Sequence, residues 1–355
     1  MVGNAVIEPV TVPIDKLHRF ARLALESREV TPDQAEICAD VMVEQDLRGH
    51  GHHGTANLRA RVADVDDGIA DPQADIEVLA EMPAMIALDA RRALGPVVSV
   101  RAMDACIAKA KTQGVGLATV RQMPHWVIPA YYSMRAAAQG LIGYCVCYTN
   151  PSFAPVGGKT RVLGNNPLSY AIPADPRPPV VVDFGVSPSS GRMRNLRDRG
   201  QPLPAGWAMD ADGEPITDPA QAMQEAVFLP VGEHRGYGLG LINELLGGPL
   251  NAMPISLLRS GRGIMGSVFM AWRTDLFRPH EEFLRDVNAG LDALVGAPRR
   301  DPKVPVRYPG ERSGLELRRN RARGEVDLSG ADWRILQSVA EHTGVELPPI
   351  VHDGD

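Results

Sequence analysis

The sequence predicts an α/β protein. Apolar runs rich in Val and Ile, such as residues 141–149 and 179–184, are typical of buried strands. Segments with apolar residues at helical spacing, such as 96–113, lie between these runs. Strands and helices of these lengths, mixed along 355 residues, favour an α/β fold over an all-α or all-β one.

The N-terminal part of the chain has a helical pattern over residues 12–49. Thr31, Pro32 and Gln34 have the residue types expected at an N-cap, at the first helical position and three residues after the cap. A helix should therefore begin at this point, and Gly49 is the residue expected to end it.

The rest of the chain mixes the two kinds of element. Strands are expected at 76–80, 84–88, 116–121, 141–149, 169–173 and 179–184, and helices at 96–113, 128–139, 285–294 and 331–343. Stretches rich in Gly and Pro predict loops at 150–167, 173–179 and 200–219. The basic run at 318–323 is interpreted as a solvated helix face.

The composition excludes several classes of function. Hydrophobic residues make up 44% and charged residues 23%, as in a folded globular protein. The net charge of −6 argues against a nucleic-acid partner, which would require clustered cations. No apolar stretch approaches the ~20 residues that cross a bilayer, and no secretory signal is visible. A cytoplasmic protein without a membrane partner is expected, with its four cysteines reduced and packed in the interior: Cys38, Cys106, Cys145 and Cys147.

Residues 261–266, GRGIMG, match the G-x-G-x-x-G pattern of dinucleotide-binding folds. That pattern binds a pyrophosphate only where a strand enters it and a helix leaves it. Here the preceding residues are a poor strand, and the residues after Gly266 have a β-like rather than a helical pattern. We therefore interpret the pattern as a glycine loop that leads into a strand.

The densest group of candidate catalytic residues is DLRGHGHHG at residues 46–54. The flanking glycines let an imidazole face a substrate, and imidazole exchanges a proton near neutral pH. A general acid/base is the favoured interpretation; a metal site and plain surface histidines are the alternatives. No carboxylate or cysteine has the spacing to complete a metal site, so no metal is expected.

This segment resembles the D-x-R-G-x-x-S-H-G signature of the malate/L-lactate dehydrogenase-like family, whose members include ureidoglycolate dehydrogenase, 2,3-diketogulonate reductase and piperideine-2-carboxylate reductase. The family is unrelated to the Rossmann-fold lactate dehydrogenases. Further matches follow in the family's order over residues 12–345, at 123–125, 149–151, 155–158, 163–167, 181–184, 206–213, 217–219, 234–238 and 308–311.

The resemblance implies a non-Rossmann α/β fold with an inserted cofactor-binding domain. That domain is expected at residues 80–275, between N- and C-terminal segments, 1–79 and 276–355, that form a second, mostly helical domain. It also implies a homodimer and an NAD(P)-dependent dehydrogenase or reductase acting on a small molecule. Cofactor contacts, with NAD or NADP, are implied for Thr149, Asp183, Phe184, Gly185, Val186, Ser187, His234, Arg235, Gly310, Glu311 and Arg312.

The resemblance places the proton donor at His53 or His125. Departures from the family pattern lie around these histidines. His52 stands where the family has a serine, and Asn57 where it has an arginine that would hold a 2-oxo acid carboxylate. Trp126 and Val127 also differ from the family. The substrate pocket is therefore expected to be altered, with contacts from His50, His52, Asn57, Trp126 and Asn166.

The expected reaction is hydride transfer between nicotinamide and the C=O carbon of a non-standard substrate related to 2-oxo and 2-hydroxy acids. The alternatives are reduction of a C=N bond in a cyclic imino acid or biosynthetic intermediate, and a non-catalytic relic on the same scaffold.

Overall fold

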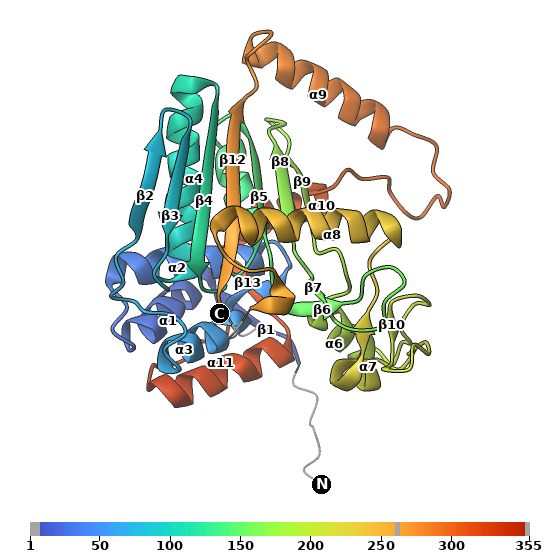
Figure 1. Ribbon diagram of the computed structural model, residues 1–355. Coiled ribbons are helices and arrows are strands. Elements are labelled where there is room, and N and C mark those ends of the chain that lie inside the picture. Colours follow the sequence, from blue (N-terminus) through green and yellow to red (C-terminus); the bar gives the residue numbers. More distant parts are fainter. Residues whose placement is uncertain (1–7, 260–262, 352–355) are drawn as a thin grey trace.

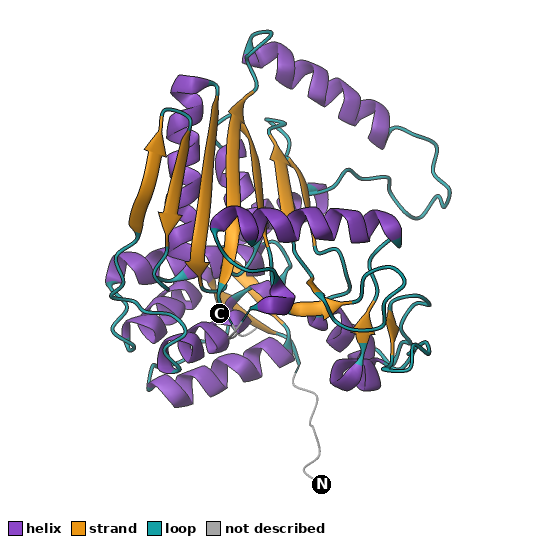
Figure 2. Ribbon diagram, viewed as in Figure 1, coloured by secondary structure: helices purple, strands orange, loops and turns teal. Residues whose placement is uncertain are grey.

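The computed structural model describes residues 8–259 and 263–351. Its centre is a seven-stranded sheet (Figures 1 and 2). The strand order is β2-β3-β4-β12-β5-β8-β9, in which β3 and β4 pair in parallel and all other neighbours pair antiparallel. The strands are β2 (Glu77–Met82), β3 (Met85–Asp89), β4 (Val115–Met123), β5 (Leu141–Cys147), β8 (Leu168–Ile172), β9 (Val180–Phe184) and β12 (Met265–Arg273).

Helices cover both faces of this sheet. On one face α4 (Gly95–Gln113) packs against β4 and β12, and α5 (Pro129–Ala137) packs against β5 and β8. On the other face α8 (His234–Gly247) crosses β5 and β12, in front of the strands in Figure 1. Because strands covered on both faces are buried throughout, β5 and β12 appear in the sequence as continuous rather than alternating apolar runs.

The two ends of the chain meet below this sheet. Strand β1 (Val10–Pro13) pairs antiparallel with β13 (Glu325–Leu328). Around this pair lie five helices: α1 (Ile14–Glu26), α2 (Pro32–Leu47), α3 (Leu58–Asp66), α10 (Glu311–Arg323) and α11 (Gly330–Thr343). The helical expectation was wrong for residues 12 and 13, because a partner more than 300 residues away draws them into a strand.

A smaller unit extends from the end of β9. It contains α6 (Ser190–Asp198) and α7 (Pro219–Glu225), and a four-stranded sheet of order β10-β11-β6-β7. Its short strands are β6 (Pro151–Phe153), β7 (Leu163–Gly164), β10 (Ala208–Met209) and β11 (Val227–Phe228). Helix α9 (His280–Val295) lies at the opposite end of the molecule (Figure 1).

Two contacts bear on the predicted two-domain division, which stays a prediction: the chain ends pair with each other, and α9 packs on the central region. Leu291 of α9 packs against Ala174 and Val180 of the central region, although the predicted boundary assigns α9 to the terminal domain. One hydrophobic cluster also runs from the N-terminal helices into the main sheet. The boundary at residue 276 stays a prediction.

Three other expectations can be compared with the structure. Helix α2 begins at Pro32 as expected, but the Thr31 side chain makes no capping hydrogen bond; Thr31 contributes only its carbonyl, to Ala35 N–H. All four cysteines are buried and free, as predicted. In the described part of the glycine pattern, residues 263–266, a short 3₁₀ turn precedes and β12 follows, which confirms a glycine loop rather than a Rossmann fingerprint. No described helix is long and apolar enough to cross a membrane.

Candidate active site

The histidine-rich loop begins where α2 ends and consists of two 3₁₀ turns, Gly51–His53 and Thr55–Asn57. The carboxylate of Asp46 fixes its shape. Asp46 Oδ2 accepts hydrogen bonds from the N–H of Thr55 (2.8 Å) and from its hydroxyl (2.7 Å). A Cβ on Gly54 would lie 1.7 Å from Asp46 Oδ1, so only glycine fits there. The Asp and the last Gly of the sequence motif are thus structural residues that position the histidines between them.

The histidines of this loop are packed together. The rings of His52 and His53 lie 4.2 Å apart between centroids. Burial, together with the nearby rings of His52 and His50, lowers the pKa of His53 to about 3. Burial is also the main cause that lowers the pKa of His50 to about 4. Both rings are therefore neutral at pH 7, a state in which imidazole accepts a proton.

The second predicted histidine, His125, follows β4 and meets the first loop. The N–H of Val127 donates to His125 Nδ1 (3.1 Å), so the neutral ring carries its proton on Nε2. The backbone of Val127 also lies close enough to the His53 ring to favour its charged form, against the larger effect of burial. Burial holds the pKa of His125 well below its usual value, and the charges of Arg61 and His53 add to that effect.

The backbone between these histidines is strained. Val127 has φ +75°, a left-handed conformation that is unfavourable for a β-branched residue. Such strain persists where the surrounding structure over-determines the conformation, and it is common at functional sites. Here the determining contacts are the burial of Val127 and the hydrogen bond from its N–H to His125.

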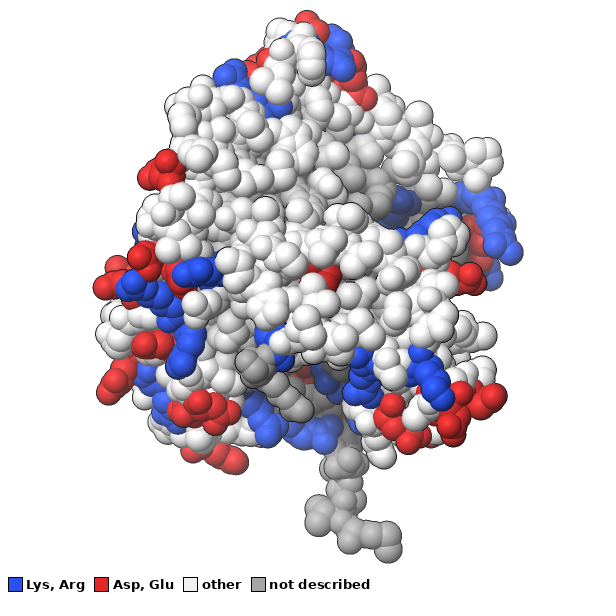
Figure 3. Space-filling model, in the orientation of Figure 1, with Lys and Arg blue, Asp and Glu red and all other residues white. Residues whose placement is uncertain are grey.

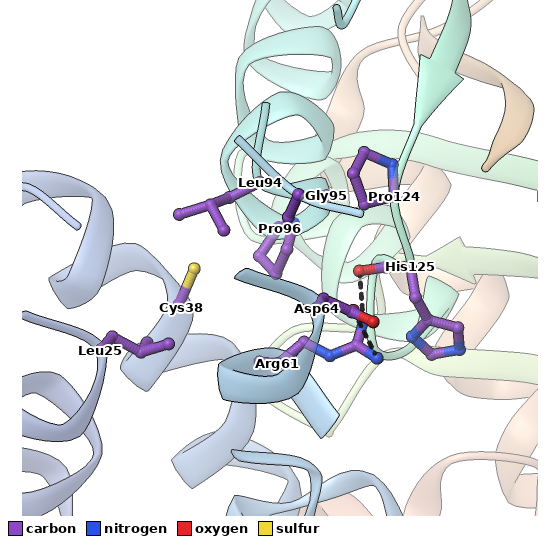
Figure 4. Close-up of a pocket in the computed structure, with 10 residues that line it drawn as sticks. Leu25, Cys38, Arg61, Asp64, Leu94, Gly95, Pro96, Pro124 and His125 are labelled. Carbon is purple, nitrogen blue, oxygen red and sulfur yellow. Dashed lines mark hydrogen bonds and ion pairs between the residues drawn. The ribbon is translucent and has the colours of Figure 1, made fainter. Parts of the chain in front are cut away.

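Arg61 of α3 anchors the second loop from behind. Its Nη1 donates to the His125 carbonyl oxygen (2.7 Å), and its Nη2 lies 3.0 Å from Asp64. Arg61 and His125 line a small pocket together with Leu25 and Cys38 (Figure 4). In that view the His125 carbonyl points toward Arg61, whereas the imidazole points away from the pocket. The pocket therefore lies behind the histidine pair, and Arg61 positions the His125 loop through its backbone.

Helix α6 packs against the histidine loop at His52. A Cβ on Gly191 would lie 3.1 Å from His52 Cδ2. Arg194 is close enough that its charge contributes to lowering the pKa of both His52 and His53, after burial as the main cause. Sequence reasoning missed Arg194. The available signal was the arginine-rich run at 192–199, which follows directly after the candidate cofactor residues.

Three of the predicted substrate contacts serve the protein's own structure. Asn57 Nδ2 donates to the His52 carbonyl (2.6 Å), so its amide supports the histidine loop. Trp126 is 1% exposed and stacks on Tyr132 in the core. Asn166 is fully buried, and its side chain bonds to Thr149 N–H (2.9 Å), the Gly240 carbonyl and Glu244. These contacts account for all three side chains, and a substrate role for them stays a prediction.

Two backbone contacts join segments of the predicted cofactor site to β9 and to the loop that follows it. The N–H of Val231, just before α8, donates to the Val186 carbonyl (2.8 Å), which places the start of α8 beside the loop that follows β9. At the other side, Val181 N–H donates to the Pro309 carbonyl (3.0 Å), so residues 310–312 lie against β9. The charge of Arg312 also contributes to lowering the pKa of His50. The start of α8 therefore lies beside the loop after β9, and the start of α10 lies beside β9 itself. Through Arg312, α10 is also near the histidine loop.

Some of the predicted cofactor residues are exposed to solvent, and others form hydrogen bonds within the protein. His234, Arg235 and Arg312 are exposed cations or potential cations. Phe184 is 41% exposed, which is unusual for an aromatic residue at a strand end. Asp183 accepts a hydrogen bond from Ala130 N–H (2.7 Å), and burial raises its pKa to about 7. Ser187 donates to the side-chain oxygen of Asn165 through both its N–H (2.9 Å) and its hydroxyl (3.0 Å).

Comparison with known proteins identifies the class of protein and then the family. The fold matches that of a solved malate dehydrogenase from Entamoeba histolytica with a TM-score of 0.90 and 26% identity, covering 96% of this chain and 100% of that one. The chain is therefore an α/β enzyme of the dehydrogenase and reductase class. The profile of the malate/L-lactate dehydrogenase family matches residues 12–337, and the chain belongs to that family.

Its curated relatives carry several activities. A malate dehydrogenase from Pyrococcus horikoshii is 30% identical over 95% of this chain and 96% of its own length. An L-sulfolactate dehydrogenase from Methanocaldococcus jannaschii is 34% identical over 79% and 80%. A Δ1-pyrroline-2-carboxylate reductase from Ancylobacter novellus is 29% identical over 94% and 98%. The chain is thus an oxidoreductase whose relatives act on different acids.

Proposed function

We propose that the protein transfers a hydride between a nicotinamide cofactor and the C=O carbon of a substrate related to 2-oxo and 2-hydroxy acids. The observation that carries this proposal is the convergence of His53 and His125 on the backbone of Val127. Two neutral imidazoles in one partly enclosed site can serve as acid and base for the substrate oxygen. The family membership supports the reaction class.

The chemistry of the linked segments fits NAD or NADP. The exposed Arg235 and Arg312 suit the phosphates, since guanidinium binds such oxygens in a bidentate manner. The exposed ring of Phe184 offers a flat apolar surface for a heteroaromatic ring. When bound, the nicotinamide ring supplies or accepts the hydride. The remaining residues that would hold the cofactor are Thr149, Asp183, Gly185, Val186, Ser187, His234, Gly310 and Glu311.

The proton chemistry follows from the state of the histidines. Because the pKa of His53 is lowered to about 3, its neutral ring is ready to accept the hydroxyl proton of a hydroxy acid. The reverse reaction requires the charged ring, which an anionic substrate nearby would favour. Val127 N–H orients His125 so that Nε2 carries the proton, and a donated hydrogen bond from that atom would polarise a carbonyl oxygen.

Reduction of a C=N bond is the second candidate. The observation that favours it is the relative named as a Δ1-pyrroline-2-carboxylate reductase, whose similarity spans nearly all of both chains. The same histidines would then exchange a proton with a nitrogen. A non-catalytic relic is the third alternative, and it would lack turnover with every substrate of either kind.

We also propose a homodimer formed through α8. The buried side of α8 faces the main sheet, and its outer side carries an apolar stripe of Leu241, Ile242 and Leu245. Ile242 is 54% exposed and Leu245 43%. A contiguous apolar stripe on a protein surface commonly marks a site of association with another chain. Figure 3, which shows this face, contains few charged side chains over α8.

The test of the proposed function is a turnover assay with NADH and NADPH on malate, L-lactate, L-sulfolactate and Δ1-pyrroline-2-carboxylate, run in the direction each allows. Fluorescence titration of both cofactors is measured on the same preparation. Turnover of an oxygen substrate supports the first proposal, and turnover of the pyrroline alone supports the second. Cofactor binding without turnover of any of these four compounds, or of further 2-oxo acids, supports the third alternative, a non-catalytic relic.

A further inference from the structure

The site contains an arginine, Arg194, that lies outside the sequence motifs. Helix α6 follows the candidate cofactor loop and packs beside the histidine loop, with Gly191 against His52. Residues three apart lie on one face of a helix, so Arg194 is on the side of α6 that faces His52 and His53.

Two other arginines of α6, Arg192 and Arg197, have partners elsewhere. The guanidinium of Arg192 lies over the ring of Trp207, 5.1 Å from its centroid. Arg197 forms an ion pair with Asp198 (2.8 Å). Among the described residues, no carboxylate forms an ion pair with Arg194. The acidic neighbour of the histidine loop, Asp332, is bonded instead to Ser329, the N-cap of α11, whose hydroxyl donates to Asp332 Oδ2 (2.7 Å).

The one arginine of the histidine loop, Arg48, is paired with Glu44 (2.8 Å), so a substrate anion needs a cation from another segment. The family's carboxylate-binding arginine is replaced by Asn57, whose amide is used on the His52 carbonyl. An anionic substrate placed among neutral, partly desolvated imidazoles requires a charged partner, because an unpaired buried anion is costly. Arg194 lies one helical turn after Gly191, which packs on His52, and both Arg194 and His52 are exposed.

We propose that Arg194 binds the anionic group of the substrate, a carboxylate or a sulfonate, in place of the missing arginine at position 57. This inference rests on the proposed function. Since Arg194 belongs to α6 rather than to the histidine loop, the acid group would be held on the α6 side of the reacting carbon. The enzyme should therefore select acids whose geometry differs from that of a simple 2-oxo acid.

The first measurement is steady-state kinetics of Arg194→Ala and Arg194→Lys on the best acid substrate and on its uncharged carboxamide. We expect Arg194→Ala to lose about 30-fold or more in kcat/KM for the acid, mainly through KM, and to lose little for the carboxamide. The lysine variant should recover part of the loss because it keeps the charge. A variant that merely disturbed the fold would lose kcat/KM equally for the acid and for its carboxamide.

The matched control is Arg197→Ala, which removes one charge from the same helix but from a residue that is paired with Asp198. It should retain the wild-type preference for the acid. NADH titration and the Tm of each variant show whether the fold and cofactor site are intact. Equal kcat/KM for the acid in wild type and Arg194→Ala would overturn the proposal.

Calorimetry separates this inference from the proposed function. Oxalate, malonate, succinate and sulfoacetate are titrated into the wild type and Arg194→Ala, each saturated with NADH. Binding of at least one anion to the wild type and its loss in the variant support Arg194 even where turnover fails. If none of them binds the wild type, or if binding is unchanged in Arg194→Ala, Arg194 is only a solvated surface charge.

Discussion

His53 and His125, which lie 72 positions apart in the sequence, meet at a single residue: the N–H of Val127 donates to His125 Nδ1, and the backbone of Val127 lies close enough to the His53 ring to influence its pKa. One histidine comes from the loop after α2 and the other from the end of β4. The shared contact couples the position of each ring to the strained conformation of Val127. Either histidine could therefore act as the general acid or base, or the two could share that role.

The first prediction separates these roles. His53→Ala should lower kcat by about 10²–10⁴-fold, because a general acid or base that acts in the transition state is removed, and NADH binding should stay nearly intact. We favour His53 over His125 since it lies in the glycine-flanked motif. Turnover of His53→Ala at the wild-type rate, together with an inactive His125→Ala, would exchange the assignments. Activity in both variants would assign the proton to another group.

The second prediction concerns pH. Because the pKa of His53 is lowered to about 3, its neutral form predominates at every pH above that value. With His53 as base, kcat/KM for oxidation of a hydroxy acid should not fall between pH 8 and pH 5. In the reducing direction the charged ring is required, so kcat/KM should fall about tenfold per unit as the pH rises. A pH profile with an inflection near 6.5, the value of an unperturbed histidine, would contradict this prediction.

The third prediction tests the cofactor site. Arg235→Ala should weaken NADH or NADPH binding by about 1.5–3 kcal/mol, because a charged hydrogen bond to a phosphate is lost. Gly263→Ala is the comparison variant, and its cofactor affinity should stay within about threefold of the wild type. Gly263 has φ +83°, so this variant is expected to lose some stability. Fluorescence titration of both variants decides, and the reverse ranking would exclude the assignment of Arg235.

The fourth prediction concerns simple 2-oxo acids. Pyruvate and oxaloacetate should be poor substrates, since the amide of Asn57 is bonded to the His52 carbonyl and offers no positive charge to their carboxylates. Their kcat/KM should lie below the common enzyme range of ~10⁴–10⁸ M⁻¹s⁻¹. A value within that range for either compound would show that Asn57 does not limit the substrate.

The fifth prediction concerns assembly. Ile242→Glu places a charge in the exposed apolar stripe of α8 and should convert the dimer to a monomer, because burying an unpaired carboxylate opposes association. Sedimentation measures the mass of the wild type and the variant. Glu281→Gln, which changes a charge on the distant helix α9, is the control. A wild type that is already monomeric at micromolar concentration would refute the dimer.

The sequence by itself determined the class of the protein, the family and the position of the histidine loop. These conclusions depend on local signals. The continuous apolar run at 141–149 indicates a strand covered on both faces, and Pro32 and Gly49 mark the two ends of α2. The spacing of Asp46 and Gly54 is also local, since the carboxylate of one occupies the space where a Cβ of the other would lie.

Only the tertiary structure decided which side chains face the site. Residues 10–13 form a strand because residues 325–328 supply its hydrogen bonds, and no pattern within either segment specifies that pairing. Trp126 lies in the core because Tyr132 and Phe269 surround it. Arg194 lies near His52 and His53 because α6 packs on the histidine loop, which comes much earlier in the chain. Burial and charge proximity are properties of distant segments brought together, so the sequence could not reveal them.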